Sequence, residues 1–229
     1  MRDGGAPDNN PRHWVNDIGN ELTIDDLVQI LQGGGVVAMP TDTFYCLAAC
    51  AINAEASQRV FEIKRRQATS AVPLLAAEAS DVMKYAVDLT EAQQLAVIAL
   101  GDRFWPGALS LVLKRSPAIP SLLSGGGETI ALRVPNAPTV REVVRRLGAP
   151  VTGTSANLSG TPAATTAAAV REALGTSVDA VVDGGMTPGG PPSTVLDLTA
   201  PTPRILRVGA IGKADLDETL REVGAPPSN

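Results

Sequence analysis

The stretch "GGVVAMPTDTFYCL" (residues 34–47) decides the fold class of this chain. Its glycines end a helical pattern, and the apolar residues that follow predict a short strand over 36–39 that Pro40 stops. Two threonines and an aspartate (41–43) come directly after this strand. Ligands of open α/β sheets gather outside the carboxyl ends of strands, whereas Pro, Asp and Thr also build ordinary turns. On this segment alone both interpretations stay open: a plain turn, or the rim of a pocket for a polar ligand.

On both sides of this stretch, helical and strand patterns alternate. Helices are predicted over residues 23–32, 54–66, 79–86, 90–100, 138–147, 164–174 and 214–222. Further strands are predicted over residues 72–76, 109–114, 129–134, 178–183, 193–198 and 204–208. This alternation predicts an α/β fold in which helices cover both faces of a mixed sheet.

The domain organisation follows from the absence of internal repeats and of a linker rich enough to split the chain. We expect a flexible N-terminal tail over residues 1–21, one domain over 22–212, and a C-terminal helix and tail over 213–229. The N-terminus lacks the apolar core of a signal peptide, and no apolar run approaches the roughly 18 residues of a membrane span. The sequence therefore favours a cytoplasmic protein without membrane contact.

The composition limits the chemistry. The 229 residues are 44% hydrophobic but only 3% aromatic, so the core is expected to be aliphatic. The single histidine is His13, and Cys46 and Cys50 lie four residues apart, so a histidine-based triad and a zinc site are excluded. We expect both cysteines to be small buried hydrophobic residues. The net charge of −5 argues against a protein that coats nucleic acid, because that binding depends on Lys and Arg.

Cations and small polar residues recur at strand and helix ends. They lie in "KRR" (64–66), at Arg133 inside "TIALRV", in "TGTSANLSG" (152–160), at Ser193–Thr194 and at Arg207 inside "RILRVG". Strand alternation puts Thr129, Ala131 and Arg133 on one face, so Thr129 and Arg133 could reach one ligand. Each of these segments can also be explained without a ligand, for example as a solvated helix end or a capped loop. In combination they indicate a pocket for a polyphosphate and a small hydroxylated ligand.

The order of these motifs resembles the YrdC-like family, the threonylcarbamoyladenylate synthases of tRNA modification. The resemblance covers residues 22–212 and includes "GGVVAMPTDTFYCL", "FEIKRR", "WPGALSLVL", "TIALRVPNAP", "VTGTSANLSG" and "STVLDL". It implies a single domain with a twisted mixed sheet around a large basic cavity. It also implies condensation of L-threonine, bicarbonate and ATP into threonylcarbamoyladenylate and pyrophosphate. A partner transferase complex would then modify adenosine 37 of tRNAs that read ANN codons.

The resemblance also implies roles for individual residues. ATP-binding roles fall on Lys64, Arg66, Ser70, Thr129, Ser155, Asn157 and Arg207, of which Lys64 and Arg66 are also expected to be catalytic. Threonine-binding roles fall on Thr43, Arg133 and Ser193. No carboxylate cluster in the sequence suits a metal cage, so Mg²⁺ is expected to arrive on ATP.

The chain departs from the family pattern in places. Cys46 replaces a usual glycine, and Leu75 stands where some members have histidine. After the Lys-x-Arg pair the family usually has Pro and then Lys or Asn, where this chain has Gln67, Ser70 and Ala71. Longer members carry a further C-terminal domain, which is not expected after residue 212. Two alternatives remain: a non-catalytic RNA-binding or ribosome-maturation protein of the same fold, and a carbamoyl-adenylate former. The second normally carries zinc-finger cysteines, which this sequence lacks.

Overall fold

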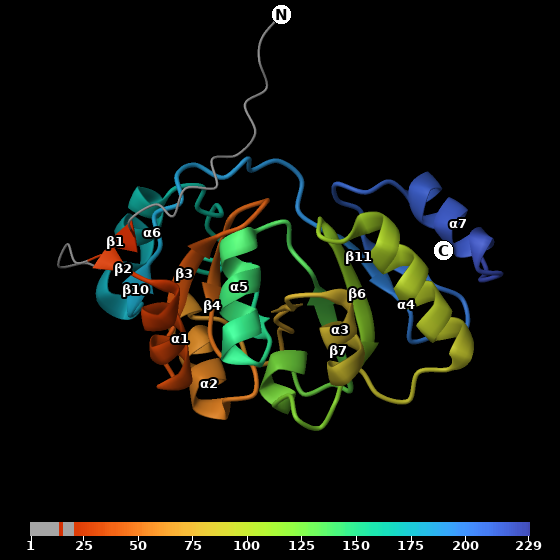
Figure 1. The fold of residues 1–229 in the computed structure, drawn as a ribbon, viewed down its shortest axis with the longest axis horizontal. Helices are drawn as coiled ribbons and strands as arrows, with labels where there is room; N and C mark the ends of the chain where they lie inside the picture. Colours follow the sequence, from red (N-terminus) through yellow and green to blue (C-terminus); the bar gives the residue numbers. More distant parts are fainter. Residues whose placement is uncertain (1–13, 16–20) are drawn as a thin grey trace, which may run out of the picture.

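The computed structural model describes residues 14–15 and 21–229, drawn in colour in Figure 1. Most of the expected N-terminal tail, residues 1–13 and 16–20, lies outside the described residues. The described remainder forms an antiparallel strand pair between β1 (Trp14–Val15) and β2 (Glu21–Leu22). Within the described residues, no helix is long and apolar enough to cross a bilayer.

The other elements confirm the mixed α/β class. The helices are α1 (Ile24–Gln32), α2 (Ala54–Lys64), α3 (Ala79–Tyr85), α4 (Glu91–Phe104), α5 (Pro138–Leu147), α6 (Ala167–Leu174) and α7 (Lys213–Glu222), with short 3₁₀ turns at Ser121–Ser124 and Gly175–Ser177. The strands are β3 (Val37–Pro40), β4 (Tyr45–Ala48), β5 (Leu74–Leu75), β6 (Leu109–Lys114), β7 (Thr129–Arg133), β8 (Val151–Thr152), β9 (Thr154–Ser155), β10 (Ala180–Val181), β11 (Thr194–Asp197) and β12 (Arg204–Arg207).

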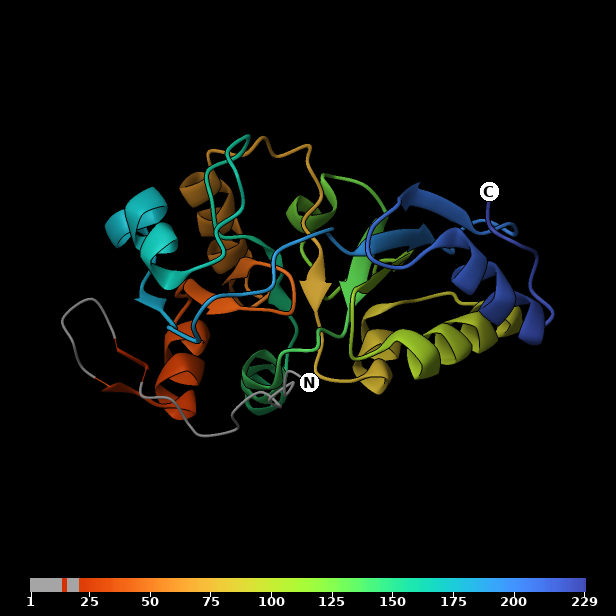
Figure 2. The ribbon, with the colours of Figure 1, turned by 90° about the horizontal axis from the view of Figure 1, so that it is seen from above.

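These strands form two mixed sheets that lie side by side (Figure 2). One has the order β10-β3-β4-β9 and the other the order β12-β11-β6-β7-β5-β8. The chain passes from one sheet to the other at Gly153, between β8 and β9. A Cβ at Gly153 would come 2.6 Å from the Leu75 side chain, so only glycine fits this crossing without displacing its neighbour. Thr152 ties the sheets together, because its Oγ1 donates to Leu47 O and accepts from Ala49 N.

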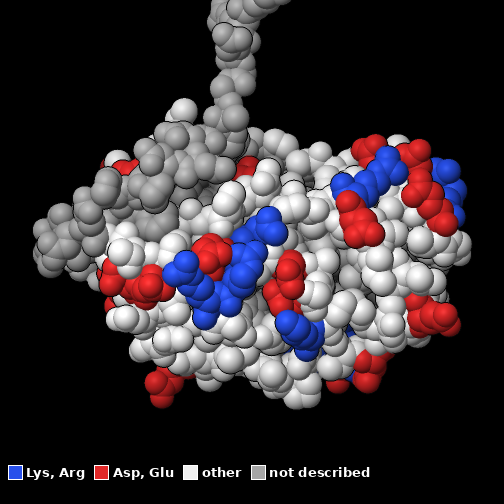
Figure 3. Space-filling view, in the orientation of Figure 1, with Lys and Arg blue, Asp and Glu red and all other residues white. Residues whose placement is uncertain are grey.

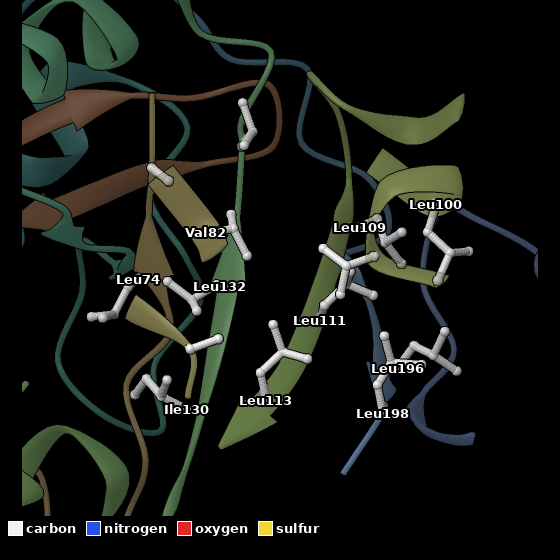
Figure 4. Packing of buried hydrophobic residues seen from close by; sticks show 14 of the residues in the cluster. Leu74, Val82, Leu100, Leu109, Leu111, Leu113, Ile130, Leu132, Leu196 and Leu198 are labelled. Atoms are coloured by element: carbon white, nitrogen blue, oxygen red, sulfur yellow. The ribbon is translucent and has the colours of Figure 1, made fainter. Parts of the chain in front are cut away.

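Helices cover the two sheets differently. The four-stranded sheet is buried on both faces, by α1 and α5 on one side and by α2 and α6 on the other. The six-stranded sheet packs one face against α3, α4 and α7, and Figure 4 shows its leucines beside Val82 of α3 and Leu100 of α4. In β6 the alternation of "LSLVLK" turns Leu109, Leu111 and Leu113 into this core and Ser110 to the opposite face. That opposite face carries no helix among the described residues, and it is where polar strand residues gather.

The C-terminal segment packs against the same core. Leu216 and Leu220 of α7 are fully buried in the cluster that contains α4. The chain end then pairs with the edge strand β12, since Ile205 N donates to Asn229 O and Asn229 N to Pro203 O, each at 2.9 Å. Residues 213–229 are therefore continuous with the core of the six-stranded sheet.

The segment 34–47 differs from the prediction in one respect. Pro40 is the last residue of β3 rather than the residue after it, and it lies opposite Tyr45 in a β3–β4 hairpin that the sequence did not indicate. All of β4 is buried, so it lacks the apolar–polar alternation that marks a half-exposed strand.

Candidate active site

The helix-free face of the six-stranded sheet brings two arginines onto one row. Ser110 of β6 lies opposite Val195 of β11, which lies opposite Arg207 of β12. Because Leu111 pairs with Leu132, Arg133 of β7 falls opposite Ser110 on the other side. The predicted facing of Arg133 is thus confirmed by the register.

Arg133 is held from two sides. Its Nη2 donates to Asp42 Oδ1 at 2.6 Å and its Nε donates to Gly107 O at 2.8 Å. The residue is only 6% exposed, whereas Nη1 makes no hydrogen bond within the described residues. Asp42, which received no individual role from the sequence, stands beside Thr43 in the turn after β3. The arginine therefore has a fixed orientation and one donor group left for a ligand.

Arg207 and Ser193 form the other end of this row. Arg207 donates from Nε and Nη2 to Ser193 O at 3.0 and 2.9 Å, and from Nη2 to Ser193 Oγ at 3.0 Å. Ser193 Oγ also lies 2.9 Å from Ser110 Oγ. Burial, and secondarily the charge of Arg133, lower the pKa of Arg207. The two arginines are therefore close enough for their positive charges to repel each other, and a bound anion would offset this repulsion.

The 41–43 segment forms the turn that one of its two sequence interpretations predicts, whereas its role at the rim of a ligand pocket stays a prediction. Thr41 makes the turn, since its Oγ1 donates to Phe44 O at 2.7 Å and accepts from the backbone N–H groups of Thr43 and Phe44. The Thr43 hydroxyl lies 3.1 Å from Thr41 Oγ1, and Thr43 is next to the Asp42 that holds Arg133. The turn thus carries a hydroxyl beside the arginine row.

A strap, which we define as residues 182–193, crosses from β10 to β11 along the top of Figure 1. Gly189 N donates to Thr43 O at 2.9 Å, and the strap ends at Ser193. The buried Tyr45 hydroxyl donates to Gly185 O at 2.7 Å and accepts from Gly184 N at 3.3 Å. The strap therefore links Thr43 and Ser193, two residues expected to bind threonine.

The remaining predicted ATP-binding residues, except Thr129, gather in a second place. An open pocket of about 500 Å³ is lined by Lys64, Arg65, Arg66, Gln67, Ser70, Ser155, Asn157, Ser159 and Gly160. This pocket adjoins the first group through the β4–β9 pair, in which Cys46 lies opposite Ser155. Its lining combines cations, hydroxyls and an amide, which suits a phosphate-bearing ligand.

Lys64 and Arg66 differ within this pocket. Lys64 is 2% exposed, and burial together with the charge of Arg66 lowers the pKa of its ammonium to about 8. Arg66 donates to Thr154 Oγ1 at 3.3 Å and to Ala71 O at 2.8 Å, while its buried Nε has no hydrogen-bond partner within the described residues. Burial lowers the pKa of Arg66 as well.

Thr129 lies apart from the other predicted site residues. It lines a separate pocket of about 270 Å³ together with Lys114, Glu128, Asp88 and other residues. Thr129 and Arg133 share a face of β7, as predicted, but four residues along a strand separate them by about 13 Å. Only an extended ligand could contact both.

The cysteine prediction is confirmed, since Cys46 and Cys50 are both free and buried. Burial raises the pKa of the Cys46 thiol to about 12, so it is a poor nucleophile at neutral pH. Among the described residues, no group of three or more His, Cys, Asp or Glu side chains is placed to hold a metal ion.

Ser110, Asp42 and Thr154 are site residues that the sequence reasoning missed. Ser110 had one usable signal, because it is the polar member of an otherwise apolar run in "LSLVLK". Asp42 and Thr154 were visible only as members of polar turns, and their partners lie 91 and 88 residues away along the chain.

Comparison with known proteins identifies relatives for most of the chain. The model of the Sua5/YciO/YrdC family, described as "Telomere recombination", matches residues 29–209. The threonylcarbamoyl-AMP synthase of Pyrococcus abyssi is 33% identical over 198 residues, covering 86% of this chain and 57% of the relative. The threonylcarbamoyl-AMP synthase of Bacillus subtilis is 35% identical over 215 residues, covering 91% of this chain and 61% of the relative.

A solved structure, that of P. abyssi Sua5 complexed with L-threonine, superposes with a TM-score of 0.81 at 32% identity, covering 90% of this chain and 58% of the other. The chain thus spans about three fifths of the length of these relatives.

Proposed function

Because the chain belongs to the Sua5/YciO/YrdC family, we propose that it is a threonylcarbamoyl-AMP synthase. It would condense L-threonine, bicarbonate and ATP into threonylcarbamoyl-AMP and pyrophosphate. The names of the two relatives and the threonine complex of the P. abyssi structure support this proposal. The product would be consumed by a transferase complex that modifies adenosine 37 of ANN-decoding tRNAs. Direct contact with tRNA and a cytoplasmic location stay predictions.

The observation that carries the proposal is the row of polar groups from Asp42 through Arg133, Ser110 and Ser193 to Arg207. Asp42 accepts a hydrogen bond from Arg133, Ser193 is hydrogen-bonded to Ser110 and Arg207, and the register of β6 and β7 places Arg133 opposite Ser110. An amino acid needs a cation for its carboxylate and small polar groups for its amine and side chain. Arg133 supplies the cation through its unused Nη1, and Thr43 and Ser193 supply hydroxyls nearby. This arrangement supports L-threonine as the ligand of the row.

The second pocket supports ATP as the other substrate. Arg66 offers an unpaired buried N–H, and the Ser70 and Ser155 hydroxyls line the same space. Arg207 is proposed to contact the phosphates where the arginine row meets the second pocket. Burial and the charge of Arg133 disfavour its positive charge, and a bound phosphate would stabilise that charge. The described residues offer no carboxylate cluster for a protein-held metal, so Mg²⁺ is proposed to come bound to the ATP phosphates.

The proposed reaction needs no side-chain nucleophile. The threonine amine and bicarbonate give N-carboxythreonine and water, and its new carboxylate oxygen attacks the α-phosphorus of ATP. The bond from the α-phosphorus to the bridging oxygen breaks, and pyrophosphate leaves with the electron pair. The chain contributes by holding the two substrates in line and by offsetting negative charge with Arg66, Arg133 and Arg207.

The RNA-binding alternative has less support on the surface shown in Figure 3. Positive and negative side chains are interleaved over α5 on that face. Arg145 and Arg146 each contact Glu142, at 2.5 and 2.7 Å, and Arg146 also contacts Asp25 at 2.8 Å. Cations that are already paired offer little to a phosphate backbone.

The test is pyrophosphate release from ATP and Mg²⁺, with L-threonine or bicarbonate omitted in turn and with serine and glycine as competing amino acids. We expect release only when threonine and bicarbonate are both present. Arg133→Gln is expected to abolish the threonine-dependent pyrophosphate release, while the control Arg141→Gln, on α5 outside both polar groups, is expected to retain it. ATP binding without threonine-dependent release in the parent protein would contradict the proposal.

A further inference from the structure

The ammonium of Lys64 has no donor left for a ligand. Lys64 ends α2, and its Nζ lies 2.5 Å from Ser155 O, 2.8 Å from Asn157 O and 3.1 Å from Asn157 Oδ1. A lysine ammonium carries three protons, so these acceptors use all of them. Only 2% of the residue is exposed, so the ammonium has little contact with water, and all of its acceptors belong to one loop.

That loop (residues 155–161) is organised around Lys64. Ser159 N donates to Lys64 O at 3.0 Å, so both the backbone and the side chain of the lysine hold it. Asn157 adds two hydrogen bonds within the loop, since its Oδ1 accepts from Ser155 Oγ at 2.5 Å and its Nδ2 donates to Thr161 O at 2.5 Å. Removal of the ammonium would take one donor from each of three carbonyl oxygens in this poorly hydrated loop. Ser155 O would keep Asn157 N and Asn157 Oδ1 would keep Ser155 Oγ, whereas Asn157 O would have no donor left within the described residues.

Arg66 stands in contrast, although it lies only two residues further along. Arg65 between them adopts a left-handed conformation with φ of 50°, which ends α2 and turns the chain. Arg66 consequently leaves the helix axis and lines the pocket with a buried Nε that has no partner within the described residues. The three N–H groups of Lys64 thus all bond protein oxygens, whereas Arg66 has an N–H group free to bond an anion.

We propose that Lys64 is a positioning residue that fixes the 155–161 loop at the rim of the ATP pocket, and that it is Arg66 rather than Lys64 that contacts the phosphates. The ATP part of this inference rests on the proposed function, whereas the loop part does not. It revises the expectation that both cations meet the nucleotide directly. For Lys64 to reach a phosphate, its ammonium would have to give up three hydrogen bonds, and Asn157 O would be left without a donor within the described residues.

Two measurements on the intact chain test the two parts. Hydrogen–deuterium exchange of the 155–161 amides is measured without ATP, and ATP affinity is measured by calorimetry at several salt concentrations. The variants are Lys64→Met, which removes the charge at similar length, and the matched Arg66→Met two residues away. A direct ion pair with phosphate is weakened by salt, so removing a phosphate ligand also removes part of the salt dependence.

We expect Lys64→Met to speed exchange in the loop about tenfold or more, because its three hydrogen bonds are lost. The residual ATP affinity should keep the salt dependence of the parent. Arg66→Met should leave loop exchange nearly unchanged, weaken ATP binding about 10- to 100-fold and reduce its salt dependence. Unchanged loop exchange in Lys64→Met, or a loss of salt dependence equal to that of Arg66→Met, would overturn the proposal.

Lys64→Arg covers the case in which Lys64→Met does not fold. It keeps the charge, and an arginine serves a phosphate ligand well, but its planar fork does not match three acceptors converging on one point. We expect Lys64→Arg to speed loop exchange and to leave ATP affinity below that of the parent. Normal ATP affinity in Lys64→Arg would assign Lys64 to the phosphates instead. If the parent itself bound no ATP, the proposed function would fail, and the exchange measurement would still decide the role of Lys64 in the loop.

Discussion

Arg133 and Asp42 form an ion pair that joins the two sheets of the molecule. The Nη2 and Oδ1 atoms are 2.6 Å apart, and the two side chains are 8% and 16% exposed. Arg133 ends β7 of the six-stranded sheet, and Asp42 lies in the turn after β3 of the four-stranded sheet. The pair therefore fixes the hydroxyl-bearing turn against the arginine row, and the proposed amino-acid site depends on it.

Asp42→Asn tests this dependence. The amide still accepts a hydrogen bond but no longer balances the buried guanidinium, so we expect the free energy of unfolding to fall by about 2 kcal/mol. The KM for threonine should rise about tenfold as Arg133 loses its orientation, with a smaller change in ATP affinity. The matched control is Asp88→Asn, whose pair with Lys114 is exposed, and which should cost no more than about 1 kcal/mol. Equal losses in the two variants, measured by urea denaturation, would show that the buried pair has no special role.

Thr43→Ala and Thr41→Ala separate ligand binding from turn formation. Besides its contact with Thr43 Oγ1, the Thr41 hydroxyl makes three hydrogen bonds to the backbone of its turn, so its alanine variant should lose about 1 kcal/mol of stability. Thr43→Ala should cost little stability but weaken threonine use more than ATP binding, because its hydroxyl lies beside the arginine row. Steady-state kinetics with each substrate varied provides the measurement. A Thr43→Ala variant that loses ATP and threonine affinity equally would remove Thr43 from the amino-acid site.

The position of Arg133 could be predicted from the sequence, because strand periodicity fixes its face once "TIALRV" is read as a strand. The position of Arg207 could not. In strict alternation Arg207 would share a face with Ile205, which packs against the core. A β-bulge at Leu206 shifts the register, so that Leu196 pairs with Ile205 and Val195 with Arg207, and it turns Arg207 to the ligand face. Nothing in "RILRVG" indicates this extra residue.

The other contacts of the candidate site could not be predicted, because they join residues that lie far apart in the sequence. Asp42 reads locally as a turn residue, and its partner Arg133 is 91 residues away. Lys64 and Arg66 read alike as cations at a helix end, yet the left-handed Arg65 gives them different surroundings. The sequence pattern thus predicted where cations and small polar residues occur along the chain, whereas the contacts that each of them makes depend on tertiary structure.

The lowered pKa of Lys64 predicts a pH dependence of stability. Burial, and then Arg66, lower this pKa from 10.5 to about 8 in the folded protein. Between these values the unfolded chain binds more protons, so the contribution of Lys64 to the free energy of unfolding increases as pH rises through this window. Relative to Lys64→Met, the parent should gain about 2 kcal/mol between pH 7 and pH 9.5 in urea denaturation. A difference between the two proteins that stays constant with pH would mean that the ammonium is not held at a lowered pKa.

Tyr45→Phe tests whether the strap over residues 182–193 supports the threonine site. Tyr45 is fully buried, and the change removes only the hydroxyl that bonds Gly184 N and Gly185 O. The ring still fills its place in the core, so stability should fall by about 1–3 kcal/mol without loss of the fold. The strap should then hold Thr43 O less firmly through Gly189, and the KM for threonine should rise several-fold while kcat and ATP affinity change less. Tyr85→Phe is the matched control, because its hydroxyl makes only a long 3.5 Å contact with Gly148 O on the surface. A threonine KM that is the same in both variants would show that the strap anchors the fold but does not position the amino acid.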